Sequence, residues 1–239
     1  MVEQEQPIGK FKWARPPTFY EAFMEEQRIP IVRGLGVHDC REVTLAPWKR
    51  MGGQGAFIQL DGTAGLIGMY LIEVPAGGAL DPERHMYEEL FYVLEGRGTT
   101  EVWVDDGSKK QTFEWQAGSA FSPPLNTNHR LVNAASSPAL LLAATNASPV
   151  FALYCNTDFI FGIPFHFADR YDGNQDYFKG NAGLVTHPLS ERHVNPNSLI
   201  PDAANCELPF DGQRGAGYRH FDVQMSGKIF RAFIAHYPS

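Results

Sequence analysis

Two stretches of the chain decide its fold: GALDPERHMYEELFYVLEG at residues 78–96 and GSAFSPPLNTNHRLVN at residues 118–133. Glu83 and His85 are two residues apart, so on an extended strand their side chains point to the same face. Glu89 opens a very apolar run in the first stretch, and His129 comes from the second. Imidazole nitrogens and carboxylate oxygens that converge inside a small barrel can bind a divalent transition metal. We therefore predict a metal site formed by these four residues.

The composition is that expected of a soluble globular protein with a net negative charge. The 239 residues are 44% hydrophobic and 20% charged, with a net charge of -7. No window is rich in Lys and Arg, so we expect neither nucleic acid nor an anionic membrane as a partner. The polar, acidic start is unlike a signal peptide, and no apolar run is long enough to span a bilayer. Three scattered cysteines argue against a disulfide framework, so a cytoplasmic location is expected.

Most of the chain has the pattern of short strands. Thr18-Phe-Tyr-Glu21 has the form of a capping box and predicts a helix over Phe19–Gln27. From Ile29 onward, β-branched and aromatic runs alternate with Gly, Pro, Asp and Asn, which favours a sandwich or barrel. The expected strands are Ile29–Arg33, Glu42–Ala46, Ala56–Leu60, Leu66–Val74, Glu89–Glu95, Thr99–Val104, Gln111–Trp115, Ser119–Ser122, His129–Asn133 and Ala139–Ala144. A hairpin turn is expected at 105–108.

The chain divides into four parts by this pattern. Residues 1–28 are an N-terminal arm and helix, and 29–146 are the barrel with the metal site. Residues 147–210 are rich in Asn, Pro and aromatics without a sustained period, so we expect an irregular arm with a helical turn near Tyr171–Phe178. Residues 211–239 are final strands. The similarity of Gln59-Leu-Asp-Gly62 to Gln224-Met-Ser-Gly227 makes them either the start of a second repeat or the last strand of the first barrel.

The two stretches resemble the paired motifs of the cupin superfamily. In the first, six residues separate Glu89 from Gly96; in the second, five residues separate Gly118 from Pro124, and three separate His129 from Asn133. The resemblance implies an all-β fold, the double-stranded β-helix or jelly-roll barrel, here with a short N-terminal helix and an irregular C-terminal arm. The whole chain also resembles the N-terminal part of bacterial two-cupin (bicupin) proteins of poorly defined activity.

Two positions depart from the family pattern. Asn126 stands where Gly is usual, and Asn tolerates the left-handed conformation better than most residues. Glu83 stands where the family most often has its first His, which changes the ligand set to two imidazoles and two carboxylates. Some family members carry Glu there, so a metal is still expected. This set favours Fe²⁺ or Mn²⁺, with Ni²⁺ or Zn²⁺ as alternatives.

The neighbours of the four ligands have simpler interpretations. Tyr87 shares their parity, so it either donates a hydrogen bond to a ligand or only packs. Glu88 has the opposite parity and is expected to face solvent. The expected pocket walls are Phe57, Met69, Phe121 and Leu131. Each of the other histidines is expected to be a surface or capping residue: His38, His166, His187, His193, His220 and His236.

These observations predict a metal-dependent enzyme that acts on a small organic molecule, such as an aromatic or carboxylic acid. By resemblance to the many cupin dioxygenases, oxygen-dependent cleavage or oxidation is the first choice of reaction. A non-redox lyase, isomerase, decarboxylase or hydrolase is the alternative, and a small-molecule-binding cupin without turnover is another. A catalytic residue beyond the metal ligands is not identified. Because open sheet edges seek partners, we also expect a homodimer.

Overall fold

The computed structural model describes residues 15–63, 65–104, 107, 110–225 and 231–237. The helix α1, Phe19–Glu26, begins at the expected capping box: the Thr18 side chain accepts from the Glu21 backbone N–H, and the Glu21 carboxylate accepts from the Thr18 backbone N–H. This mutual pairing satisfies two backbone donors that would otherwise be free at the helix start. Among the described residues, no helix is long and apolar enough to cross a membrane.

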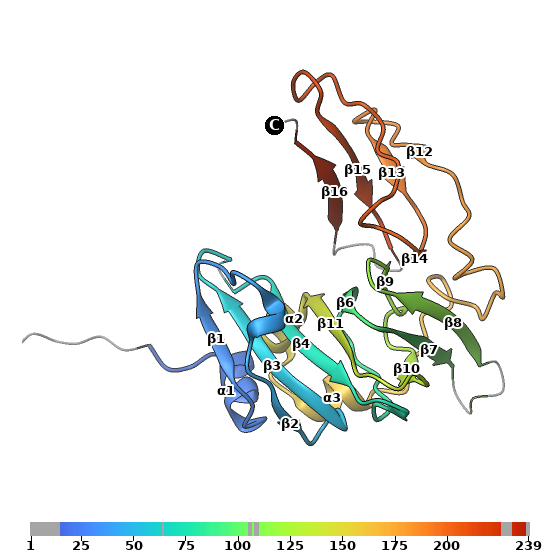
Figure 1. The fold of residues 1–239 in the computed structure, drawn as a ribbon. Helices are drawn as coiled ribbons and strands as arrows, with labels where there is room; N and C mark the ends of the chain where they lie inside the picture. The colour runs from blue at the N-terminus through green and yellow to red at the C-terminus, as the bar shows by residue number, and fades with distance from the viewer. Residues whose placement is uncertain (1–14, 64, 105–106, 108–109, 226–230, 238–239) are drawn as a thin grey trace, which may run out of the picture.

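The barrel is built from two sheets (Figure 1). Its strands are β1 Ile31–Gly34, β2 Ala46–Trp48, β3 Gly53–Leu60, β4 Gly68–Val74, β5 Gly78–Ala79, β6 Glu89–Glu95, β7 Arg97–Trp103, β8 Gln111–Gln116, β9 Ala120–Phe121, β10 Asn128–Asn133, β11 Ala139–Thr145 and β14 Leu199–Ile200. The larger sheet has the order β1-β3-β4-β11-β6-β9-β14, with β2 paired to β3. The smaller sheet has the order β5-β10-β7-β8. The all-β prediction is confirmed.

Side-chain alternation along β6 and β10 decides what faces the barrel interior. Glu89, Phe91 and Val93 are buried, and the residues between them are partly exposed. On β10, His129 and Leu131 are buried in the same way. Fully burying an apolar side chain of this size contributes about 1.5–3 kcal/mol, so a one-residue slip in either strand would be costly. The register of the two strands therefore also fixes the direction of Glu89 and His129.

One expected strand is wrong. Residues 42–46 do not form a strand; instead a 3-10 turn spans Cys40–Glu42, and β2 starts only at Ala46. The cause is local, because the Asp39 side chain accepts a hydrogen bond from the Arg41 N–H and caps the turn. The β7–β8 pairing is antiparallel, as a hairpin requires. Residues 105, 106 and 108 of its expected turn lie outside the described residues.

The segment after the barrel is more regular than expected. It begins with α2, Ala147–Tyr154, and α3, Thr157–Gly162. The Asn156 side chain caps α3 by accepting from the Phe159 N–H. In α2, Phe151 is fully buried against Phe23 of α1, with ring centroids 4.7 Å apart. Apolar burial therefore makes a helix where the sequence shows no periodicity. The expected helical turn near Tyr171–Phe178 is a hydrogen-bonded turn rather than a helix.

A third sheet follows, with the order β12-β13-β15-β16 (Figure 1). Its strands are β12 Val185–Thr186, β13 His193–Asn195, β15 Arg219–Val223 and β16 Ala232–His236. Strand β16 pairs with β15, so it is not a final strand of the first barrel. Apolar residues of this sheet pack with Leu90 and Tyr92 on the outer side of β6. Residues 226–230, which include Ser226 and Gly227 of the expected repeat start, lie outside the described residues, and the repeat stays a prediction.

Candidate metal site

Backbone hydrogen bonds bring the two sequence stretches together. The Glu83 N–H donates to the His129 carbonyl at 2.8 Å, and the His129 N–H donates to the Glu83 carbonyl at 2.9 Å. The Asn126 N–H donates to the His85 carbonyl at 3.1 Å. Asn126 has a φ of 55°, which is the left-handed conformation that the sequence predicted for this turn. The segment between β5 and β6 is thus paired directly to β10.

Both imidazoles are held by the nitrogen that faces away from the site. Nδ1 of His85 lies 2.9 Å from the Tyr87 carbonyl, and Nδ1 of His129 lies 3.2 Å from the Thr127 carbonyl. A carbonyl can only accept, so in the neutral ring Nδ1 carries the hydrogen in each case. The Nε2 lone pairs are then free to bind a metal. Carbonyl-anchored imidazoles of this kind are typical of metal-ligating histidines.

The two carboxylates lie on either side of the imidazoles. Glu89 Oε2 is 3.4 Å from His85 Nε2 and 3.6 Å from His129 Nε2. Its other oxygen, Oε1, accepts a hydrogen bond of 2.5 Å from the Tyr70 hydroxyl. Glu83 forms an ion pair with Arg50. Each carboxylate is therefore oriented by its own partner, Tyr70 on one side and Arg50 on the other.

The donor atoms fit a bound cation. One ligand atom each from Glu83, His85 and His129 lie within 4.8 Å of one another. Glu89 is not in that set, although its Oε2 is next to both imidazoles. Among the described residues, His85 Nε2, His129 Nε2 and Glu89 Oε2 are buried without a hydrogen-bond partner. Buried polar atoms without partners are costly, and a divalent metal would satisfy all three. Ligation by these four residues stays a prediction, but the structure brings them together.

Burial and neighbouring charges shift the pKa values of Glu89, His129 and Tyr70. Burial raises the pKa of Glu89, but the neighbouring His85 and His129 lower it by more, so the net shift is downward. Burial lowers the pKa of His129, and Glu89 raises it by more. Burial and the charge of Glu89 raise the pKa of Tyr70 well above its usual value. The Tyr70 hydroxyl therefore stays protonated and available to donate to Glu89.

A narrow pocket adjoins Glu83, the one predicted ligand that lines it. Its cavity volume is about 10 Å³, which is room for about one water molecule. The Tyr87 ring, predicted to donate or to pack, stacks on the His85 imidazole with centroids 3.7 Å apart and an angle of 3°. The pocket is lined by Tyr20, Phe23, Trp48, Arg50, Met51, Phe57, Tyr70, Glu83, Tyr87, Thr145, Ala147 and Phe151. Residues from α1 and α2 thus close one end of the barrel beside the predicted ligands.

Three expectations about the surroundings are corrected. Of the expected pocket walls, only Phe57 lines the pocket. Met69 is only partly buried because the alternation of β4 turns Tyr70 inward instead, and Phe121 and Leu131 are buried in the hydrophobic core without lining the pocket. Glu88 is 5% exposed and not solvated, since it pairs with Arg170 at 2.8 Å. His220, expected at the surface, is 2% exposed. In the last two cases, the covering residues come from the segments after the barrel, which strand parity cannot reveal.

Two residues that contact the predicted ligands were not identified from the sequence. Tyr70 and Arg50 belong to β4 and to the connection between β2 and β3, outside both motif stretches. The parity of β4 could have identified Tyr70, had the register been known. No local pattern identifies Arg50.

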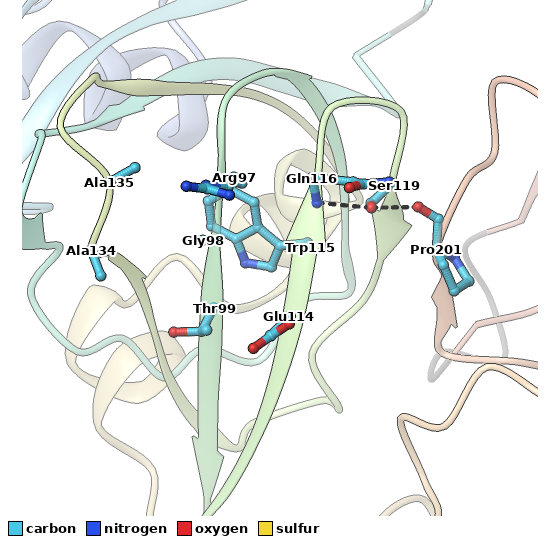
Figure 2. Close-up of a pocket in the computed structure, with 10 residues that line it drawn as sticks. All are labelled: Arg97, Gly98, Thr99, Glu114, Trp115, Gln116, Ser119, Ala134, Ala135 and Pro201. Atoms are coloured by element: carbon cyan, nitrogen blue, oxygen red, sulfur yellow. Dashed lines mark hydrogen bonds between the residues drawn. The ribbon is translucent and has the colours of Figure 1, made fainter.

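A larger opening lies elsewhere, on the outer side of β7 and β8 (Figure 2). It is lined by Arg97, Gly98, Thr99, Glu114, Trp115, Gln116, Ser119, Ala134, Ala135 and Pro201. Ser119 Oγ accepts from the Gln116 N–H at 3.0 Å and donates to the Pro201 carbonyl at 2.6 Å. These bonds tie β14 to the barrel. None of the predicted ligands lines this opening, so we assign it no role in the chemistry.

Comparison with known proteins agrees with the fold and the motifs. Residues 70–145 match the family model described as a cupin domain. This match contains all four predicted ligands, Glu83, His85, Glu89 and His129, and identifies this part of the chain as a cupin domain. No curated protein matches the chain. Its relation to two-cupin proteins stays a prediction.

Several solved structures resemble part of the chain. An oxalate decarboxylase from Lactobacillus farciminis, in complex with formate, is 22% identical, with a TM-score of 0.38 over 44% of this chain and 31% of that one. A recombinant oxalate oxidase in complex with glycolate is 23% identical, with a TM-score of 0.32 over 35% and 43%. A protein from Photorhabdus luminescens is 16% identical, with a TM-score of 0.38 over 49% and 92%. The match spans about a third of the oxalate decarboxylase.

Proposed function

We propose that this protein is a metal-dependent cupin enzyme that acts on a small organic molecule. One observation carries the proposal: three buried ligand atoms, His85 Nε2, His129 Nε2 and Glu89 Oε2, converge without hydrogen-bond partners among the described residues. Structural histidines and carboxylates in a core are normally paired with each other or with the backbone. Here the metal-binding atoms of His85, His129 and Glu89 have no such hydrogen bond.

The residues of the chain have distinct roles in this proposal. Glu83, His85, Glu89 and His129 hold the metal, which when bound supplies a Lewis acid or, as iron or manganese, a redox centre. Tyr70 keeps Glu89 oriented by donating to Oε1. The aromatic walls from α1 and α2 exclude water from the pocket. Exclusion of water strengthens every electrostatic interaction inside it.

Oxygen-dependent oxidation or cleavage is our first choice of reaction, with Fe²⁺ or Mn²⁺ as the metal. A non-redox lyase, isomerase, decarboxylase or hydrolase is the second choice. It is favoured by Glu83, since a second carboxylate makes the ligand set harder than the usual three imidazoles and better suited to a Lewis acid. A cupin that binds a small molecule without turnover is the remaining alternative.

Metal content and oxygen consumption test this proposal. We expect the purified wild type to contain close to one equivalent of Fe or Mn by elemental analysis, and to consume oxygen with a member of a panel of small acids. His129→Gln should lose both properties, while His236→Ala, which changes an exposed histidine of β16, should keep them. Turnover in anaerobic buffer would reject the oxygen-dependent reaction in favour of the non-redox one. Equal metal content in wild type and His129→Gln would reject the metal site.

We also propose that the chain forms a homodimer. Strand β1 ends the larger sheet, and its outer edge has no further strand among the described residues. An open edge of this kind favours pairing with another chain. Light scattering after size-exclusion chromatography should give twice the mass of the chain, and a monomer at micromolar concentration would contradict the proposal.

A further inference from the structure

Arg50 gives Glu83 a counter-charge that the other predicted carboxylate ligand lacks. Its Nη1 donates to Glu83 Oε1, and the two side chains are 25% and 5% exposed. The ligand atoms that are buried without a hydrogen-bond partner among the described residues belong instead to His85, His129 and Glu89. A guanidinium is always charged in a protein. Of the two carboxylates, only that of Glu83 is therefore paired with a permanent positive charge.

The fold holds Arg50 against Glu83. The Gly52 N–H donates to the Trp48 carbonyl at 3.0 Å, which closes a turn in the connection between β2 and β3 that carries Arg50. The guanidinium lies 4.0 Å from the centre of the Phe161 ring of α3. The face of an aromatic ring attracts a cation, so Phe161 is a second contact that favours this position of Arg50. The ion pair is thus built into the packing of the barrel end.

Little water can reach this ion pair. The pocket that Arg50 and Glu83 line has a cavity volume of about 10 Å³, with room for about one water molecule, and its other walls are mainly aromatic and aliphatic. A charge that loses its partner in such surroundings is costly, because solvent does not screen it. Loss of Arg50 would therefore leave Glu83 as an uncompensated buried carboxylate in the metal-free protein.

Arg50 and a bound cation would draw on the same carboxylate. One ligand atom of Glu83 lies within 4.8 Å of those of His85 and His129, and Glu83 is also the partner of Arg50. A carboxylate shared between two cations compensates each of them less, and two cations in a buried site repel each other.

We propose that Arg50 competes with the metal for Glu83 and so holds the metal affinity of the barrel below that of four unpaired ligands. The inference rests on the proposed function, because it concerns the same metal site. It makes Arg50 a residue that determines metal affinity through Glu83, without being a ligand itself.

Calorimetric titration with Mn²⁺ tests this inference. We expect Arg50→Gln to bind manganese about tenfold more tightly than wild type, because no charged hydrogen bond to Glu83 has to be weakened when the metal binds. Arg50→Lys keeps the positive charge and should remain close to wild type. Phe161→Leu removes the ring face that holds the guanidinium but changes no charge, so its affinity should lie between those of wild type and Arg50→Gln.

The thermal unfolding midpoint is a second measure of the competition. Without metal, Arg50→Gln should unfold at a lower temperature than wild type, because Glu83 has lost its counter-charge. Saturating Mn²⁺ should raise the midpoint of Arg50→Gln by more than that of wild type. An arginine that only supports the fold would lower both midpoints alike and leave the shift caused by manganese unchanged.

Controls separate this inference from the proposed function. Arg33→Gln, which removes a half-exposed arginine of β1, should bind manganese as wild type does. Failure of wild type to bind manganese would reject the proposed function. If wild type binds manganese and Arg50→Gln binds it equally or more weakly, the inference about Arg50 is overturned. Should Arg50→Gln fail to fold, Phe161→Leu decides, and binding no tighter than in wild type overturns the inference.

Discussion

Two buried histidines, one in the barrel and one in the C-terminal sheet, have opposite surroundings. His129 in β10 is 1% exposed, and its Nε2 faces His85 and Glu89 without a hydrogen bond. His220 in β15 is 2% exposed and lies between two carboxylates. Its Nδ1 is 3.2 Å from Asp211 and its Nε2 is 3.9 Å from Asp222. In the barrel, two imidazoles point toward one carboxylate, that of Glu89. At the second site, one imidazole has a different carboxylate near each of its two nitrogens.

The difference shows that convergence, not composition, makes a metal site. Both places offer imidazole and carboxylate groups in a protected setting. Both ring nitrogens of His220 also lack a hydrogen bond among the described residues, but only the barrel anchors each Nδ1 on a backbone carbonyl and directs two Nε2 atoms toward one carboxylate. Among the described residues, the only group of three candidate ligands within 4.8 Å is Glu83, His85 and His129. His220 is better explained as a structural residue paired with two acids.

The largest expected difference between the two sites is in manganese affinity after loss of a side chain at each site. We expect His129→Gln or Glu89→Ala to lower manganese affinity by about a hundredfold or more, since each removes a ligand and the loss of a supporting residue alone typically costs about 10–100-fold. His220→Ala should leave the affinity unchanged. Calorimetric titration with Mn²⁺ measures both. Equal affinities for His129→Gln and His220→Ala would show that the barrel residues do not form the site.

The converse expectation concerns stability without metal. His220→Ala should lower the free energy of unfolding by about 2 kcal/mol, because Asp211 and Asp222 lose their shared partner while remaining partly buried. Urea unfolding of the metal-free protein at pH 7 gives this value. His236→Ala, at an exposed position of the same sheet, is the matched control and should change stability little. A loss below about 0.5 kcal/mol for His220→Ala would mean that the two acids do not depend on it.

Removal of one tyrosine hydroxyl at each of the two sites tests the comparison further. Tyr70→Phe removes the donor to Glu89 Oε1 and should weaken manganese binding about tenfold. Tyr218→Phe is the counterpart next to His220; the Tyr218 hydroxyl is buried but has no hydrogen-bond partner among the described residues. It should leave manganese binding as in wild type. An unchanged affinity in Tyr70→Phe would mean that Glu89 keeps its orientation without that bond.

The smallest expected effect is on stability, at the exposed capping box of α1. There the Glu21 carboxylate lies outside both histidine sites. The Arg15 side chain and the Thr18 backbone lower the pKa of Glu21 to about 2. Its contribution to stability is therefore present above the usual carboxyl pKa and is lost as the pH falls toward 2. Glu21→Ala should cost about 1 kcal/mol at pH 7, after allowance for solvent screening, and progressively less below pH 4. Urea unfolding at several pH values measures this; a difference that does not change with pH would contradict it.

Much of the barrel site could be predicted because its signals are local. Glu83 and His85 share a strand face, and Glu89 opens a strand whose alternate residues are apolar. The two motif stretches meet in the structure, because the backbones of Glu83 and His129 pair with each other. The capping box at Thr18 is equally local. In each case, a few neighbouring residues contain the information.

The sequence by itself determined the strand faces, the capped first helix and the identity of the four residues that meet in the barrel, because side-chain period and turn chemistry act over a few residues. Only the tertiary structure decided that Arg50 and Tyr70 orient the two carboxylates, that Arg170 buries Glu88, and that α1 and α2 close the pocket. These partners come from distant segments of the chain. Their meeting depends on how the helices and sheets pack, and no short-range pattern encodes that packing.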